Sequence, residues 1–461
     1  MLILALAASV AAPLPEQTGP VLPTHAPAQT GSAEPAEAPA QEALPPRPAP
    51  SAITGAPPPP APHLLGDWGG VRTALEANGI TPTIQYIAMP AWNVSGGTQE
   101  RVEYAGQLTM GATADLDRIA GIQGGSFQLL VTNRHGRNLN ATAGLEVLQQ
   151  PQAIFGAGQI WRLSQLFYRQ KLGKVEAKIG RMSIGEDFGT APCFFESLYF
   201  CGIVPGHVTP NYWYNPPVSV WGARVKVEDG LGYTQVGVYE RNPTNLREDR
   251  GFYLGTAGQT GALIPLERGF TVKLGGDARR PGIYKIGVWH DTSRSEDLVR
   301  DVDGGYAALS GLPLAQARGR WGGYFVARQQ LTAPAADGSG VFNLFLSGTL
   351  TDGRTNLIRS ILVAGGTWSG ILRGRPKDEI GLAIGRTRIN DRLTEVEARQ
   401  RALGLTDRSP QRAEWAAELA YSIVVDPAFS LRPNLQLYHH PGGRTDRNTV
   451  AVLGLGAFVT L

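Results

Sequence analysis

Charged side chains recur at every second position of several short segments. Arg224 and Lys226 alternate with apolar residues in Ala223-Arg-Val-Lys-Val227. A guanidinium offers five donors in a fixed fork and a carboxylate accepts hydrogen bonds, so these groups, beside aromatic faces, suit the vicinal hydroxyls of a sugar. For most of them the alternative is that they solvate and brace a polar wall. The candidate solute-contacting residues of these faces are Arg134, Arg137, Arg162, Arg224 and Lys226.

Motifs for covalent or cofactor chemistry are missing from the sequence. It has no Gly-x-Ser-x-Gly elbow, no His-Glu-x-x-His and no phosphate loop ending in Gly-Lys-Ser/Thr. We therefore expect neither an enzyme nor a cofactor, and no metal site, since no His or Cys pair accompanies the two cysteines. The net charge of +3 is small for 461 residues and the cations are dispersed, which argues against nucleic acid as a partner.

The two cysteines, Cys193 and Cys201, lie close together in the aromatic stretch Pro192-Cys-Phe-Phe-Glu-Ser-Leu-Tyr-Phe-Cys201. In an exported protein, this arrangement predicts one disulfide that closes a small loop. Two buried free thiols are the alternative.

The segments that carry the charged residues are predicted to be strands. In Arg432-Pro-Asn-Leu-Gln-Leu-Tyr438, Leu435 and Leu437 share one face while Asn434 and Gln436 share the other. No segment after residue 12 reaches the roughly 18 apolar residues of a spanning helix. A chain of this kind can cross a membrane only as a closed barrel.

Three features favour a membrane barrel over a soluble β-protein. Alternating segments continue through most of the chain, and short turns such as Asp229-Gly230 alternate with long loops such as 205–217. Aromatic residues also lie near strand ends, where we expect an interfacial girdle. We therefore predict an all-β fold, a transmembrane antiparallel up-and-down β-barrel. The predicted girdle residues are Trp221, Tyr239, Trp289, Trp321, Trp415 and Tyr438.

The N-terminal part divides into three predicted regions. Residues 1–12 resemble the apolar core and cleavage site of a secretory signal peptide without its charged start, so either the signal is short or it begins upstream. Residues 13–62 are rich in Pro and Ala and are predicted to form a disordered spacer. The barrel domain is predicted for residues 63–461, with a short amphipathic helix at 69–79.

Colinear motifs resemble one known family. Leu65-Gly-Asp-Trp-Gly-Gly-Val-Arg-Thr-Ala-Leu-Glu-Ala-Asn-Gly-Ile80 is similar to the opening signature of the carbohydrate-selective outer-membrane porins of OprB type. Tyr284-Lys-Ile-Gly-Val-Trp-His-Asp291 and Gly374-Arg-Pro-Lys-Asp378 follow in the family's order. The final strand pair, which begins at Leu431, resembles the family's closing pair. The likeness covers roughly residues 64–461, and several motifs in order are more specific than any one alone.

The resemblance implies a monomeric barrel of about sixteen strands in the bacterial outer membrane, with loops folded into the lumen. It implies passive diffusion of mono- and disaccharides, glucose foremost, into the periplasm. By motif position it carries constriction roles onto Arg134, Arg137 and Arg181. The implied partners are outer-membrane lipid, small sugars and the barrel-assembly machinery.

Other functions remain open at this point. A porin for polyols, sugar acids or anions would also use arginine-rich tracks. A wall-binding structural barrel, which would contact the cell wall through the Pro-rich arm, and an outer-membrane barrel enzyme are more distant alternatives.

Overall fold

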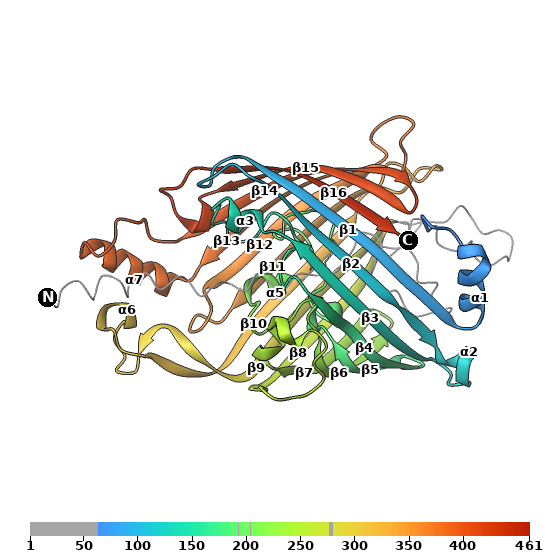
Figure 1. Ribbon diagram of the computed structural model, residues 1–461, viewed down its shortest axis with the longest axis horizontal. Coiled ribbons are helices and arrows are strands. Elements are labelled where there is room, and N and C mark those ends of the chain that lie inside the picture. Colours follow the sequence, from blue (N-terminus) through green and yellow to red (C-terminus); the bar gives the residue numbers. More distant parts are fainter. Residues whose placement is uncertain (1–62, 192, 203, 276–279) are drawn as a thin grey trace.

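The computed structural model describes residues 63–461 except 192, 203 and 276–279. Within these residues, sixteen antiparallel strands close into one barrel in which sequence neighbours pair and β1 pairs with β16 (Figure 1). This confirms the predicted up-and-down barrel. The strands are β1 Ile80–Ser95, β2 Val102–Asp115, β3 Gly125–Gly136, β4 Trp161–Leu172, β5 Val175–Met182, β6 Val220–Asp229, β7 Gly232–Arg241, β8 Gly261–Leu274, β9 Arg280–Asp301, β10 Leu314–Gln330, β11 Phe342–Thr351, β12 Ile358–Ser369, β13 Glu379–Ile389, β14 Ala413–Asp426, β15 Phe429–His439 and β16 Val450–Thr460.

The helices are short and lie in the connections between strands. The helix α1, Val71–Ala77, falls within the range predicted for the N-terminal helix. None of the helices in the described residues has the length and hydropathy needed to span a membrane. The others are α2 Leu116–Ala120, α3 Leu139–Thr142, α4 Ile184–Asp187, α5 Val204–Val208, α6 Ala307–Ser310 and α7 Asp391–Ala402, with 3-10 turns η1 Trp68–Gly70, η2 Pro243–Leu246, η3 Glu248–Arg250 and η4 Pro441–Gly443.

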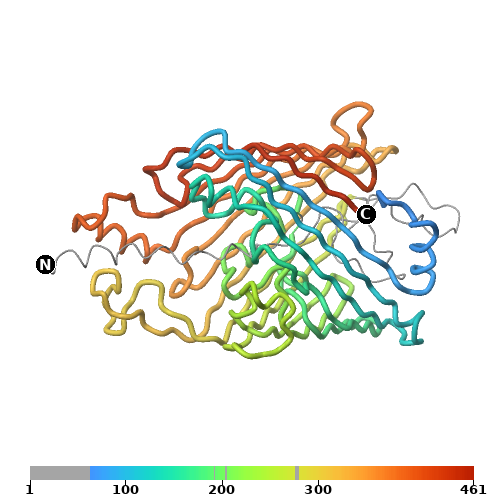
Figure 2. The backbone as a smooth tube through the Cα atoms, in the orientation of Figure 1, coloured from blue at the N-terminus to red at the C-terminus, as the bar shows by residue number. Residues whose placement is uncertain are grey.

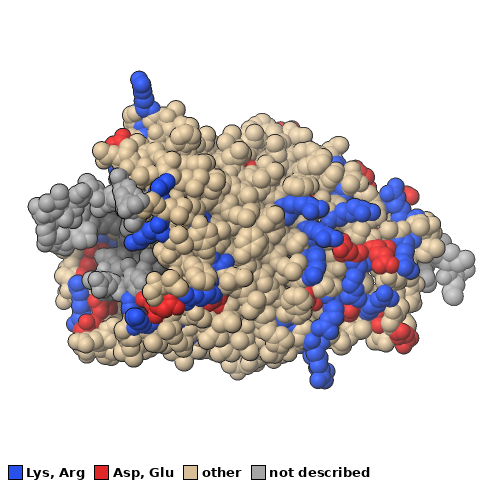
Figure 3. Space-filling model, turned by 180° about the vertical axis from the view of Figure 1, so that it is seen from behind, with Lys and Arg blue, Asp and Glu red and all other residues tan. Residues whose placement is uncertain are grey.

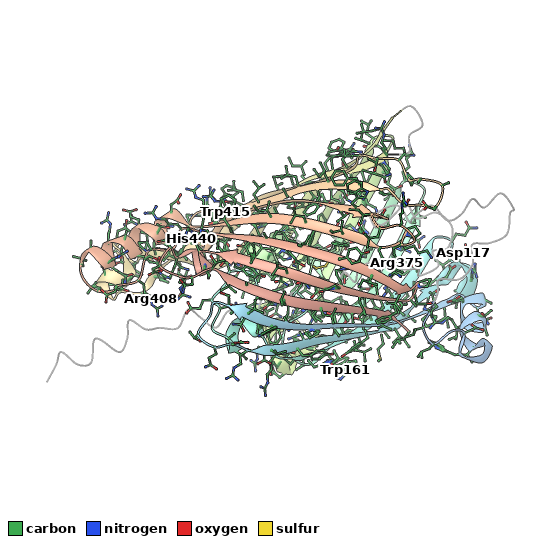
Figure 4. All side chains as sticks on the ribbon, turned by 90° about the horizontal axis from the view of Figure 1, so that it is seen from above. Asp117, Trp161, Arg375, Arg408, Trp415 and His440 are labelled. Carbon is green, nitrogen blue, oxygen red and sulfur yellow. A yellow bond between two sulfur atoms is a disulfide. The ribbon has the colours of Figure 1, made fainter. Side chains whose placement is uncertain are left out.

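The two ends of the barrel differ in the length of their connections. One, the short-turn end, carries tight turns such as 173–174 and 230–231, and the other, the long-loop end, carries 137–160, 183–219 and 390–412. At the short-turn end the last residue of the chain lies beside α1 (Figure 2), where Arg72 Nη2 donates to the Leu461 carbonyl at 2.8 Å. Asp117 and Arg375 lie at this end, and Arg408 lies at the other (Figure 4).

The two faces of each strand differ in polarity. On the outer face of β5, β6 and β7, Ile179, Val225 and Val236 are exposed, whereas Lys178 and Arg224 on the inner face are buried. The visible surface accordingly shows an uncharged band between charged ends (Figure 3). An apolar exterior around a polar interior is the pattern of a barrel in a bilayer.

The predicted aromatic girdle is half wrong. Trp221, Trp321 and Trp415 are exposed on the outer face, but the other three side chains point inward and are buried. Nearness to a strand end does not determine the face, because each step of one residue reverses it. The inward residues have partners in the loops that fold into the lumen. They are Tyr239, Trp289 and Tyr438.

The predicted signal peptide at 1–12 and the Pro-rich arm at 13–62 lie outside the described residues.

Candidate functional site

The connection between β5 and β6, residues 183–219, folds into the barrel and packs against one wall. Tyr212, Trp213 and Tyr214 are fully buried. The Trp213 ring meets the Trp289 ring edge-on, with centroids 5.2 Å apart. Large aromatic side chains bury much apolar area, so this contact holds the loop firmly to the wall. The wall residues in the same cluster are Tyr239, Leu263, Trp289 and Tyr324.

The same connection also packs against the next arc of the wall. Its segment around the Cys193–Cys201 disulfide carries Phe195 and Tyr199, both buried. The Phe195 and Phe345 ring centroids are 5.9 Å apart. This loop therefore packs against two adjoining arcs of the barrel wall, β7–β10 and β11–β15. Wall residues of this second cluster include Ile361, Val363, Ala383, Ala416 and Tyr438.

A second connection, residues 137–160 between β3 and β4, also turns inward. Leu139 and Leu145 are buried in the cluster that contains Phe195. Gln152 Nε2 donates to the Met89 carbonyl at 2.8 Å, which fixes the loop to β1. The two loops together narrow the path through the lumen.

Arg134 lies on the inner face of β3, as its spacing from Gln128 and Thr132 requires. Its side chain is 1% exposed. Nε donates to Gln107 Oε1 at 2.8 Å, Nη1 to the Gly156 carbonyl at 3.3 Å and Nη2 to the Pro216 carbonyl at 3.4 Å. The guanidinium thus connects the wall to both inward loops.

Arg162 and Arg181 bind loop backbone in the same way. Arg162 Nη1 donates to the Asn245 carbonyl at 2.8 Å and Nη2 to the Leu246 carbonyl at 3.0 Å. Arg181 Nη2 donates to the Ser219 carbonyl at 2.7 Å. Both side chains are buried, so these two arginines position the loops as well as carrying charge on the inner wall.

Arg224 belongs to a buried charge network on β5 and β6. It pairs with Glu176, and its Nε lies 3.5 Å from Asp187 of α4. Lys178 Nζ lies 2.9 Å from the same Asp187 carboxylate. Lys226, on the same inner face, is half-buried, with Nζ 5.5 Å from the Tyr233 ring centroid.

Arg137 lies apart from this group. It follows β3 in the loop, its side chain is exposed, and its backbone N–H donates to the Tyr104 carbonyl at 2.8 Å. The structure therefore brings five of the six predicted cations onto the inner wall and leaves Arg137 at the long-loop end.

Sequence reasoning missed three carboxylates of the inner wall that bind the loops. Glu267 accepts from the Gly189 N–H at 2.9 Å, and Glu414 and Glu418 also accept from loop N–H groups. Their signal in the sequence is an acidic residue at the inward position of an alternating strand, as in Glu414-Trp-Ala-Ala-Glu418. The sequence does not show the loop partners, so such a residue is interpreted from the sequence only as a solvated group of the barrel wall.

Two acids of the 183–219 loop titrate abnormally. Burial raises the pKa of the Glu186 carboxyl to about 7, although Lys178 opposes the shift. Burial, and next the Glu418 carboxylate, raise the pKa of Glu196 well above its usual range. In both cases removal from water disfavours the charged form.

The described residues contain no group of three or more His, Cys, Asp and Glu side chains placed to hold a metal ion. What the arrangement can do is restrict and sort solutes, because a polar barrel interior is narrowed by loops held to its wall.

Comparison with known proteins supplies the family. The model of the family described as "Carbohydrate-selective porin, OprB family" matches residues 99–461. The chain belongs to this family. It is 36% identical over 413 residues to Porin B of Pseudomonas aeruginosa, covering 85% of this chain and 90% of the relative. It is 31% identical over 419 residues to a putative porin, QuiX, of Acinetobacter baylyi, covering 85% and 91%.

A solved structure agrees with the fold of this porin. The high-pH structure of Pseudomonas putida OprB has a TM-score of 0.83 and 35% identity, covering 86% of this chain and 97% of that one. The porin is therefore an outer-membrane β-barrel. Family and fold point to a channel rather than an enzyme.

Proposed function

We propose that this porin is a passive channel through which mono- and disaccharides of the glucose type cross the outer membrane into the periplasm. The observation that carries the proposal is the match of the carbohydrate-selective porin family to residues 99–461. An exported precursor with a signal peptide at 1–12 and assembly by the barrel-assembly machinery belong to the same proposal, as does a monomeric state.

The chemistry of the lumen supports a neutral, hydroxyl-rich solute. Carboxylates and cations are paired along the inner wall, as in the network that joins Glu176, Lys178 and Arg224 of the wall to Asp187 of α4. Paired charges leave a smaller net field than cations alone would. A solute that exchanges hydrogen bonds with both donors and acceptors suits such a wall better than a purely anionic one.

The residue roles are part of the proposal. Arg134, Arg162 and Arg181 would shape the constriction by holding loop carbonyls, and would add positive potential to the path. Arg224 and Lys226 would contribute to the wall nearer the short-turn end, and Arg137 would contact solutes at the long-loop end. The disulfide between Cys193 and Cys201 would stiffen the loop that folds into the lumen.

Purified porin in liposomes tests this function. Swelling is measured with sugars of rising size, with polyols and with sugar acids of matched size. Faster entry of neutral mono- and disaccharides supports the proposal. Equal or faster entry of polyols, sugar acids or small anions would assign the channel to those solutes instead.

Deletion of residues 13–62 separates the channel from a wall-binding role. Transport that survives the deletion agrees with a channel, whereas a loss of cell-wall contact with no measurable transport in either form would favour the structural alternative.

A further inference from the structure

β14 carries two carboxylates on its inner face, Glu414 and Glu418, that meet the backbone of the inward connections. Both side chains have an exposed fraction of 0%. They lie four residues apart on one strand, so their side chains leave the same face. A buried carboxylate is costly unless its oxygens accept hydrogen bonds, and here they accept bonds from loops that are distant in the sequence.

Glu414 is the point where three connections of the long-loop end converge. Its Oε1 and Oε2 each lie 2.9 Å from the Leu148 N–H of the 137–160 loop. Oε1 also accepts from the Tyr199 hydroxyl of the 183–219 loop at 2.8 Å, and Oε2 from the Gly442 N–H of η4 at 2.7 Å. All of these donors are neutral, so the carboxylate is held by the loops themselves.

Glu418 accepts hydrogen bonds from the backbone of the segment that contains the Cys193–Cys201 disulfide. One oxygen accepts from the Glu196 N–H and the other from the Ser197 N–H, each at 2.8 Å. Ser197 Oγ is also hydrogen-bonded to the Tyr438 hydroxyl of β15, at 2.8 Å. Bonds from N–H groups to a carboxylate are shorter and stronger than those between neutral groups. The segment is thus tied to the wall by its backbone, independently of its aromatic side chains.

We propose that Glu414 and Glu418 are positioning residues that determine the width of the solute pathway. They do so by fixing the 137–160 loop, the 183–219 loop and η4 to β14. The inference rests on the proposed function in that the path they limit is the one sugars would take. The carboxylates act through the loops and need not touch a solute.

The isosteric double variant Glu414→Gln/Glu418→Gln tests the proposal. An amide keeps the size of the side chain but has one accepting oxygen, so at Glu418 one of the two loop N–H groups then faces a donor. Released loops should raise the single-channel conductance in planar bilayers by about twofold or more and make the current noisier. In liposomes the variant should admit larger oligosaccharides than the unmodified porin does.

Glu395→Gln is the matched control. Glu395 lies on α7 with a side chain 52% exposed and pairs with Arg399 at 2.7 Å, so the same chemical change should leave conductance and size limit unaltered. Heat-modifiable migration in gels establishes that each variant barrel is folded. A folded double variant with the conductance and size limit of the unmodified porin would overturn the proposal.

Amide hydrogen exchange of the unmodified porin gives a second test that does not depend on folding of the variant. The amides of Leu148, Glu196, Ser197 and Gly442 should be as protected as those in the strands. Exchange at the rate of the exposed 230–231 turn would refute the proposal. Conductance and exchange need no sugar, so a porin without sugar preference would defeat the proposed function alone and leave this inference standing.

Discussion

Replacement of Arg134 by alanine removes the guanidinium that links β3 to both inward loops. Gln107 Oε1 and the carbonyls of Gly156 and Pro216 then lose their donor inside the protein. A buried acceptor left without a partner costs about 1–3 kcal/mol, so the three together destabilise the contacts between β3 and the loops by roughly 3–9 kcal/mol. The strand pairs of β3 are untouched, so we expect the loops to loosen while the barrel persists.

Planar bilayer recordings measure the consequence. We expect Arg134→Ala to weaken the block of current by sugar and to shift the reversal potential toward lower anion preference, because a fixed positive charge has gone from the path. At about tenfold for each 1.4 kcal/mol, exchange of the amides around Gly156 should accelerate by at least about a hundredfold.

Arg399→Ala is the control, since the Arg399 side chain is 54% exposed on α7, outside the lumen. A folded Arg134→Ala porin with unchanged sugar block, reversal potential and loop exchange would refute the reasoning, and selectivity would then be sought at Arg162, Arg181 or Arg137.

Three further predictions concern the loop and the arm. Because burial raises the pKa of Glu186 from 4.5 to about 7, the folded loop favours the protonated form of this carboxyl. The contribution of Glu186 to the free energy of unfolding is therefore greatest below pH 4.5 and falls by roughly 3 kcal/mol as the pH rises through 7. Protection of the loop amides, measured as their exchange rate relative to that of an unstructured amide at the same pH, should therefore fall between about pH 5 and about pH 8, and Glu186→Gln should flatten the change. Thiol labelling of the unreduced, unfolded porin should find no free thiol at Cys193 or Cys201, and replacement of both by serine should increase current noise with the barrel intact; two labelled thiols would count against the bridge. Residues 13–62 should be cleaved by protease at low dose with transport unchanged, and a protected arm would contradict the spacer assignment.

Much of the fold could be predicted because its cause is local. The alternation of Leu435 and Leu437 with Asn434 and Gln436 is visible in seven residues, and the structure keeps both faces as predicted. The same two-residue alternation predicts that Arg134 faces the lumen, because an even number of positions separates it from Gln128. The family resemblance, also a property of the sequence, supplied the strand number.

The wrongly predicted girdle residues show that a local pattern does not determine which face of a strand an aromatic residue occupies. Trp289 and Trp321 lie near the middle of the neighbouring strands β9 and β10, yet one packs against Trp213 inside the barrel and the other faces outward. An aromatic residue suits either place, since both are partly apolar. Only the register of the whole strand separates them.

The sequence by itself determined that the chain alternates polar and apolar faces along many strands, because that pattern depends only on the two-residue repeat of the backbone. Tertiary structure decided what the inner charges do. Glu414 meets a loop N–H 266 positions earlier in the chain, and Arg134 meets a carbonyl 82 positions later. Hydrogen bonds form over about 3 Å in space, whatever the separation along the chain, so no local pattern could reveal that these wall charges hold the loops that narrow the lumen.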